Sequence, residues 1–119
     1  MRIAIITQRK DSLAAFSAGL AAQGAQTDWL STPKQAIDQA RIYPRNMVIL
    51  DDQTGDFRAI LSDLMEANAL LHTAVITPMD AESFHEASEG LGVLSSLPPS
   101  PNAEHAHYLM DKLKEVLGG

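Results

Sequence analysis

The sequence predicts an α/β domain with a five-stranded parallel sheet and helices on both faces. Short apolar runs rich in β-branched residues alternate with segments whose apolar residues recur every three or four positions. The connections between these segments are short, and 119 residues suit one domain. Regular alternation of this kind is typical of parallel strands joined by crossover helices, which gives a three-layer doubly wound architecture. We therefore expect one domain over residues 1–119.

Five segments have the composition of strands. IAIIT, MVIL and TAVIT are continuous apolar runs, typical of strands covered on both faces. AQTDWLS and GVLSS are weaker, and AQTDWLS suits an edge of the sheet. In chain order the expected strands cover 3–7, 25–31, 47–50, 73–77 and 92–96.

The segments between the strands have helical periodicity. Leu13, Phe16 and Leu20 form a stripe on the first segment, and Pro44 ends the second. The third segment has the clearest apolar face and the fourth is short and polar. The expected helices lie within 8–24, 31–44, 57–72, 79–90 and 100–119.

Composition excludes several classes of function. The chain has no cysteine, which removes disulfides and thiolate metal sites. Its net charge of −6, from 9 basic and 15 acidic residues, argues against binding to nucleic acid or to an anionic membrane surface. No apolar run approaches the roughly 18 residues of a membrane span, and the first residues do not resemble a signal peptide. We therefore expect a cytoplasmic protein.

Polar residues follow the predicted strands. Doubly wound sheets bind ligands at the carboxyl ends of their strands. The polar residues at these ends are Thr7, Asp51, Asp52, Thr77, Ser95 and Ser96. The pair of aspartates after MVIL suggests a phosphate acceptor, a metal ligand or the polar start of a loop. For Asp52 we favour ordinary turn chemistry, and for Thr77 hydrogen bonding to the loop backbone.

Three stretches carry a resemblance to a known family. QAIDQARIYPRNMVILDD, AVIT and GLGVLSSLPPSP resemble successive parts of the CheY-like receiver domains of bacterial two-component response regulators. The resemblance runs over nearly the whole chain and implies a flavodoxin-like topology. It places Asp51 at the phospho-acceptor position and Thr77 at the switch hydroxyl. Pro98 would be the proline of the family's Lys-Pro pair.

The sequence departs from this family at the residues that support phosphorylation. Thr7 and Gln8 stand where the family has an acidic pair that binds Mg²⁺, and Leu97 replaces its lysine. Phosphoryl transfer to a carboxylate concentrates negative charge, which a divalent cation and a lysine normally neutralise. We therefore interpret the chain as a degenerate pseudo-receiver without a resident cofactor. Weak Mg²⁺ binding is expected only at Asp51, and Asp52 helps only if the chain turns there.

The resemblance also implies how the domain works. Receivers commonly dock partners on the face formed by the fourth helix, the fifth strand and the fifth helix. In this sequence that face would comprise Phe84, Leu91, Leu94, His105, Tyr108 and Lys112. We expect signalling or regulation through protein–protein interaction, without conventional Mg²⁺-dependent phosphorylation. The partner would be a kinase, an output domain or a second copy in a homodimer.

Two alternatives remain open from the sequence. One is a working receiver that is phosphorylated on Asp51. The other is a regulatory module that binds a small molecule at the strand ends, in a pocket formed by Thr7, Gln8, Asp51, Thr77, Ser95 and Ser96. The sequence has no Ser-His-Asp order, no phosphate-binding glycine loop and no G-x-G-x-x-G, so we expect no enzymatic activity.

Overall fold

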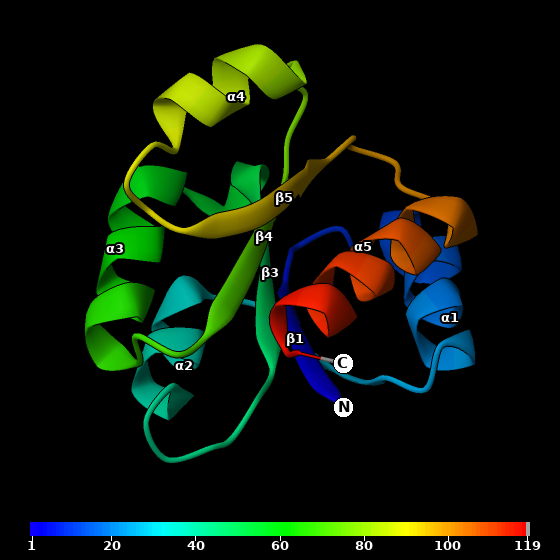
Figure 1. Ribbon diagram of the computed structural model, residues 1–119, viewed down its shortest axis with the longest axis horizontal. Coiled ribbons are helices and arrows are strands. Elements are labelled where there is room, and N and C mark those ends of the chain that lie inside the picture. The colour runs from blue at the N-terminus through cyan, green and yellow to red at the C-terminus, as the bar shows by residue number, and fades with distance from the viewer. Residues whose placement is uncertain (119) are drawn as a thin grey trace.

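A parallel sheet forms the centre of the molecule, as the sequence predicts (Figure 1). The computed structural model describes residues 1–118. The sheet order is β2-β1-β3-β4-β5, and every pair of neighbouring strands is parallel. The strands are β1 (Arg2–Ile6), β2 (Gln26–Leu30), β3 (Met47–Asp51), β4 (His72–Ile76) and β5 (Val93–Leu97). Within the described residues, no helix is long and apolar enough to cross a membrane.

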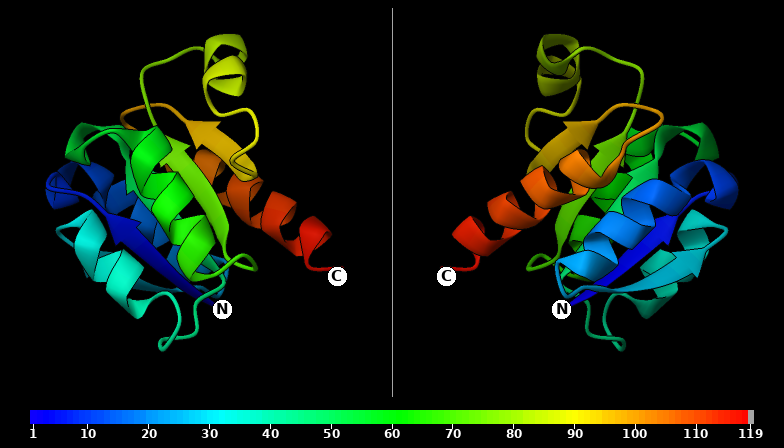
Figure 2. Two further views of the ribbon diagram at one scale, coloured as in Figure 1. Left: turned by 90° about the vertical axis from the view of Figure 1, so that its left-hand side faces the viewer. Right: turned by 90° about the vertical axis from the view of Figure 1, so that its right-hand side faces the viewer.

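Helices cover both faces of this sheet (Figures 1 and 2). On one face lie α1 (Ala14–Ala22) and α5 (Ala103–Val116). On the other lie α2 (Pro33–Gln39), α3 (Phe57–Ala67) and α4 (Ala81–Ala87). Two short 3₁₀ helices, η1 (Lys10–Leu13) and η2 (Asp52–Thr54), follow β1 and β3. The short connections after the strands therefore meet at one edge of the sheet.

The core is divided in two by the sheet. Successive side chains of a strand point to opposite faces, so Ile3 and Ile5 pack under α1 and α5 while Ile6 packs under α2 and α3. Both sets are buried, which explains why the central strands are continuous apolar runs rather than alternating ones.

The third helix is shorter than predicted. The segment 57–72 was expected to be helical throughout, but α3 ends at Ala67. The side-chain amide of Asn68 donates to the carbonyl of Ala40 at 3.0 Å, and its backbone is extended. This bond holds the chain outside helical geometry. The helical pattern was therefore extended too far, and His72 begins β4.

The second helix is also shorter than predicted, because residues 40–46 form a loop before β3. Arg2 and Arg45 both pair with Asp28, and both guanidinium groups lie over the ring of Tyr43, at 4.6 and 4.3 Å. Partial burial raises the pKa of Asp28, but the hydrogen bonds and charges of the two arginines outweigh it and hold that pKa below its usual range. The cluster fixes this loop against β1 and β2.

Helices α1 and α5 approach each other closely at Gly19. A Cβ atom at this position would lie 2.8 Å from the Cβ of Ala106 and 2.9 Å from the Cα of Ala103. Real Cβ contacts are essentially never this short. The glycine therefore allows α5 to lie directly against α1.

We expect Gly19→Ala to lower the free energy of unfolding by about 1–3 kcal/mol, because the added methyl group overpacks the contact. This loss would occur although alanine is the better helix former by about 1 kcal/mol. Urea denaturation of both proteins measures the difference. Exposed Ala18 offers a matched control, because Ala18→Gly reports helix propensity alone. A stabilised Gly19→Ala protein would contradict the close contact.

Candidate functional site

The candidate site lies where the strands end. Ile6 pairs with Leu50 across β1 and β3, and Asp51 pairs with Ile76 across β3 and β4. The polar residues at the ends of these three central strands therefore lie next to one another, as the topology requires. Thr7 and Thr77 are themselves largely buried.

Asp51 is a buried carboxylate. Only 1% of the residue is exposed. Its Oδ2 atom accepts hydrogen bonds from the hydroxyl of Thr7 at 2.7 Å and from Nε of Arg9 at 2.8 Å. Its Oδ1 atom accepts from the backbone N–H of Gln53 at 3.4 Å. The last of these bonds caps η2, so the carboxylate also fixes the turn that follows β3.

Arg9 supplies the positive charge at this site. Its side chain is 21% exposed, and its Nη2 atom donates to the backbone carbonyl of Pro99 at 3.0 Å. Its own N–H donates to the hydroxyl of Thr7 at 2.9 Å, which leaves that hydroxyl to donate to Asp51. Arg9 was not among the site residues predicted from the sequence. The available signal was an arginine two residues beyond the polar end of β1.

Asp52 and Thr77 form a separate pair. The chain turns into η2 after Asp51, and the carboxylate of Asp52 accepts a hydrogen bond from the hydroxyl of Thr77 at 2.5 Å. The same hydroxyl accepts from the backbone N–H of Met79 at 3.3 Å. Thr77 thus bonds to the loop backbone as expected. Its carboxylate partner is Asp52 rather than the residue at the acceptor position.

Two other predicted site residues turn away from Asp51. The side chain of Gln8 is exposed and donates to the carbonyl of Ser31 at 2.8 Å. Leu97 is buried in the core beneath α1 and α5. The cationic and neutral groups around Asp51 do not match the oxygen-rich ligand set that Mg²⁺ prefers. Within residues 1–118, no cluster of three or more His, Cys, Asp or Glu side chains is arranged to hold a metal.

A groove of about 230 Å³ lies between α4, β5 and α5. Phe84, only 4% exposed, lies in its wall next to Phe57, so it offers little surface of its own. Tyr108 is half exposed, and the ammonium group of Lys112 lies 5.2 Å from the centre of its ring. The remaining lining residues are Ala81, His85, Ser88, Val93, Leu94, Ser95 and Ser96. Both serines predicted for a strand-end pocket thus line this groove.

Two residues predicted for the same face do not line this groove. His105 lies in the first turn of α5, where its Nδ1 atom accepts from the backbone N–H of Asn102 at 3.0 Å. Leu91 packs on the core beneath α2 and α3. The docking role assigned to this face remains a prediction.

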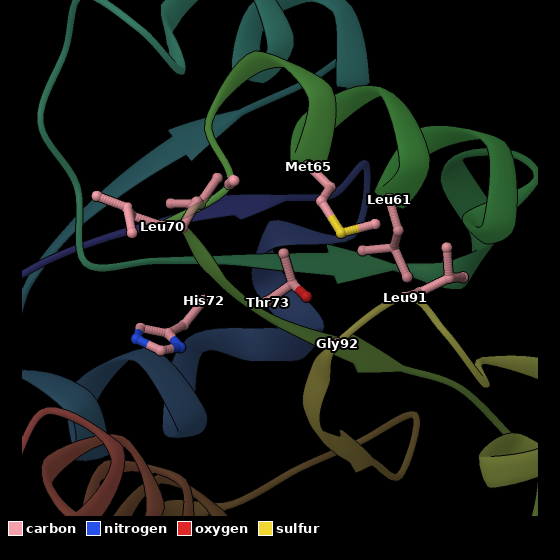
Figure 3. Close-up of a pocket in the computed structure, with 9 residues that line it drawn as sticks. Leu61, Met65, Leu70, His72, Thr73, Leu91 and Gly92 are labelled. Atoms are coloured by element: carbon pink, nitrogen blue, oxygen red, sulfur yellow. The ribbon is translucent and has the colours of Figure 1, made fainter.

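A larger cavity, of about 310 Å³, lies elsewhere (Figure 3). It is lined mainly by apolar side chains between α3 and the start of β4, including Leu61, Met65 and Leu91. The imidazole of His72 points away from the other labelled side chains. No aspartate, glutamate, lysine or arginine belongs to this lining. Among the described lining residues, His72 is the one titratable side chain, and the cavity lies at the opposite edge of the sheet from Asp51.

Comparison with solved structures identifies the fold. A two-component response regulator from Clostridium difficile superposes with a TM-score of 0.83 at 14% identity, over 100% of this chain and 99% of that chain. The fold is that of a receiver domain. A response regulator from Thermotoga maritima gives a TM-score of 0.80 at 14% identity, over 99% and 98% of the two chains.

The fold also matches a protein that is not named as a response regulator. A putative CpaE2 pilus assembly protein from Sinorhizobium meliloti has a TM-score of 0.75 at 14% identity, over 95% of this chain and 99% of that one. No family model matches the sequence, and no curated protein does. Identities this low establish the receiver fold and leave the function to be argued from the site.

We expect Arg9→Ala to lower the free energy of unfolding at pH 7 by about 3 kcal/mol, because it leaves a buried carboxylate without its cation. Asp51→Asn should cost only about 1 kcal/mol, since Arg9 can reach water and asparagine still accepts hydrogen bonds. The double variant should cost less than the sum of the two. Chemical denaturation measures all three proteins.

Lys34→Ala is the matched control, because Lys34 forms an exposed pair with Asp38. Its effect should stay within about 0.5 kcal/mol. If Arg9→Ala were as mild as this control, the pairing of Arg9 with Asp51 would not contribute to stability.

Proposed function

We propose that this domain regulates a partner protein by docking, without Mg²⁺-dependent phosphorylation of Asp51. The observation that carries the proposal is the bond between Arg9 and Asp51. At this edge of the sheet Arg9 provides a fixed cation, and that cation is already paired with the acceptor carboxylate.

The chemistry of phosphoryl transfer supports this reading. The attacking carboxylate needs an available lone pair, and the transferred group needs positive charge on its oxygens. In this site Oδ2 of Asp51 already accepts two hydrogen bonds, from Thr7 and Arg9. The residues at the acidic-pair positions, Thr7 and Gln8, are neutral, and so is the buried Leu97. None of the three supplies the charge that the reaction requires. A single paired guanidinium replaces a divalent ion and a lysine.

The groove between α4, β5 and α5 supports docking as the mode of action. It combines apolar walls, the half-exposed ring of Tyr108 and the ammonium of Lys112, and none of its lining residues is acidic. Partly exposed aromatic side chains beside a cation are typical of protein interfaces. The partner is a protein, whether a kinase, an output domain or a second copy.

Amide NMR of the wild-type protein should show no change with millimolar Mg²⁺, alone or with beryllofluoride, a mimic of the acyl phosphate. The physical reason is that Arg9 occupies the acceptor carboxylate. Shifts at Asp51 and Thr77 that spread into α5 would contradict the proposal and support the working-receiver alternative.

The variant Gln8→Asp/Arg9→Ala provides the matched control for this titration. It returns one carboxylate to the acidic-pair position and releases Asp51 from the guanidinium. We expect this variant to show Mg²⁺-dependent shifts near residues 8 and 51. A response here together with a silent wild type would assign the loss of metal binding to these two positions.

Tyr108→Ala/Lys112→Glu should abolish capture of the partner, because it removes the exposed ring and reverses the charge of the groove. Affinity capture with sedimentation analysis compares it with wild type. The control is Leu70→Asp, at a residue that is 87% exposed and lies at the opposite edge of the sheet. Loss of binding in the control alone, or an inert monomer in every case, would contradict docking at the groove.

A further inference from the structure

The guanidinium of Arg9 joins three connections that are far apart in the sequence. Arg9 lies in the connection after β1, Asp51 ends β3, and Pro99 lies between β5 and α5. Nε donates to the carboxylate at 2.8 Å while Nη2 donates to the carbonyl of Pro99 at 3.0 Å. One planar group thus binds two acceptors from two separate nitrogens in a fixed fork, whereas a lysine would have to reach both acceptors from a single nitrogen.

The segment that carries Pro99 is conformationally stiff. Prolines occupy 98, 99 and 101, and each fixes its own φ angle. Pro101 is also buried. Directly after it, Asn102 caps α5: its side chain accepts from the backbone N–H of Glu104 at 2.9 Å and of His105 at 3.2 Å. The bond from Arg9 therefore acts on a stiff link that leads straight into the first turn of α5.

Residues that precede this link in the chain and residues that follow it both line the groove. Ser95 and Ser96 of β5 precede it, and Tyr108 and Lys112 of α5 follow it. The position of the start of α5 relative to β5 therefore sets the width of the groove. The first turn of α5 also contacts α1, because Ala103 and Ala106 lie against Gly19. Further along the helix, the buried side chains of Leu109, Met110 and Leu113 hold it on the sheet.

We propose that Arg9 is a positioning residue for the docking groove. By binding Asp51 and Pro99 together, it fixes the link before α5, and with the contact at Gly19 it holds the start of the helix and the groove at one width. Asp51 serves as the anchor for Arg9, which explains why the carboxylate is buried and fully engaged. This inference rests on the proposed function, because the proposed function gives the groove its docking role.

The test compares Arg9→Ala, Arg9→Lys and Lys34→Ala with wild type by amide hydrogen exchange and chemical shifts in metal-free buffer. We expect Arg9→Ala to speed exchange of the amides of residues 102–109 by about tenfold, as loss of one charge-assisted hydrogen bond would do. The signals of Ser95, Ser96 and Tyr108 should shift as well. Lys34→Ala should leave them unchanged.

Arg9→Lys separates positioning from charge. A lysine can neutralise Asp51, but it lacks the second nitrogen from which Arg9 donates to Pro99, so we expect α5 to loosen as in Arg9→Ala while stability is largely kept. If Arg9→Lys left α5 and the groove as in wild type, or if the changes in Arg9→Ala stayed within residues 7–9 and 51–53, the inference would be overturned. Should Arg9→Ala fail to fold, Arg9→Ala/Asp51→Asn takes its place, because it buries no unpaired charge.

The two proposals fail in different ways. A beryllofluoride response of the wild type would end the proposal of phosphorylation-independent action and leave the effect of Arg9 on α5 standing. An unchanged α5 in both Arg9 variants would end the positioning role, whatever the wild type does with Mg²⁺. Each result is read from a different sample and a different part of the spectrum.

Discussion

A carboxylate with almost no contact with water must find its counter-charge inside the protein, and Asp51 places that constraint on one whole edge of the sheet. Removing the charge from water is costly unless a cation and several hydrogen bonds replace the lost hydration. Thr7 and Arg9 meet this requirement from the neighbouring strand end. The path of the connection after β1 and the position of the loop before α5 both follow from where the guanidinium must lie.

The central strands were predictable because they are buried on both faces. A strand beneath two layers of helices must be apolar at every position, so runs such as IAII and MVIL stand out from their surroundings. The helix ends were less predictable. Apolar spacing continues past Ala67 in the sequence. The helix ends there because the side chain of Asn68 donates to a carbonyl 28 residues away and accepts from the backbone N–H of Leu70.

The candidate site was predictable in part for the same reason. Sheet topology alone brings the ends of β1, β3 and β4 together, which placed Thr7 next to Asp51. Topology does not determine the reach of a long side chain in a loop. Arg9 was missed because its direction depends on the turn that precedes α1. Gln8 was misplaced among the lining residues for the same reason, since its side chain turns to Ser31.

The covalent attachment of this cation has a consequence for its competition with dissolved ions. A guanidinium on the same chain as the carboxylate is present at a high effective concentration, set by the short tether and independent of the surrounding solution. A dissolved divalent ion must displace it and also shed part of its own hydration shell. The counter-charge of Asp51 is therefore encoded in the polypeptide itself and does not depend on an ion taken up from solution.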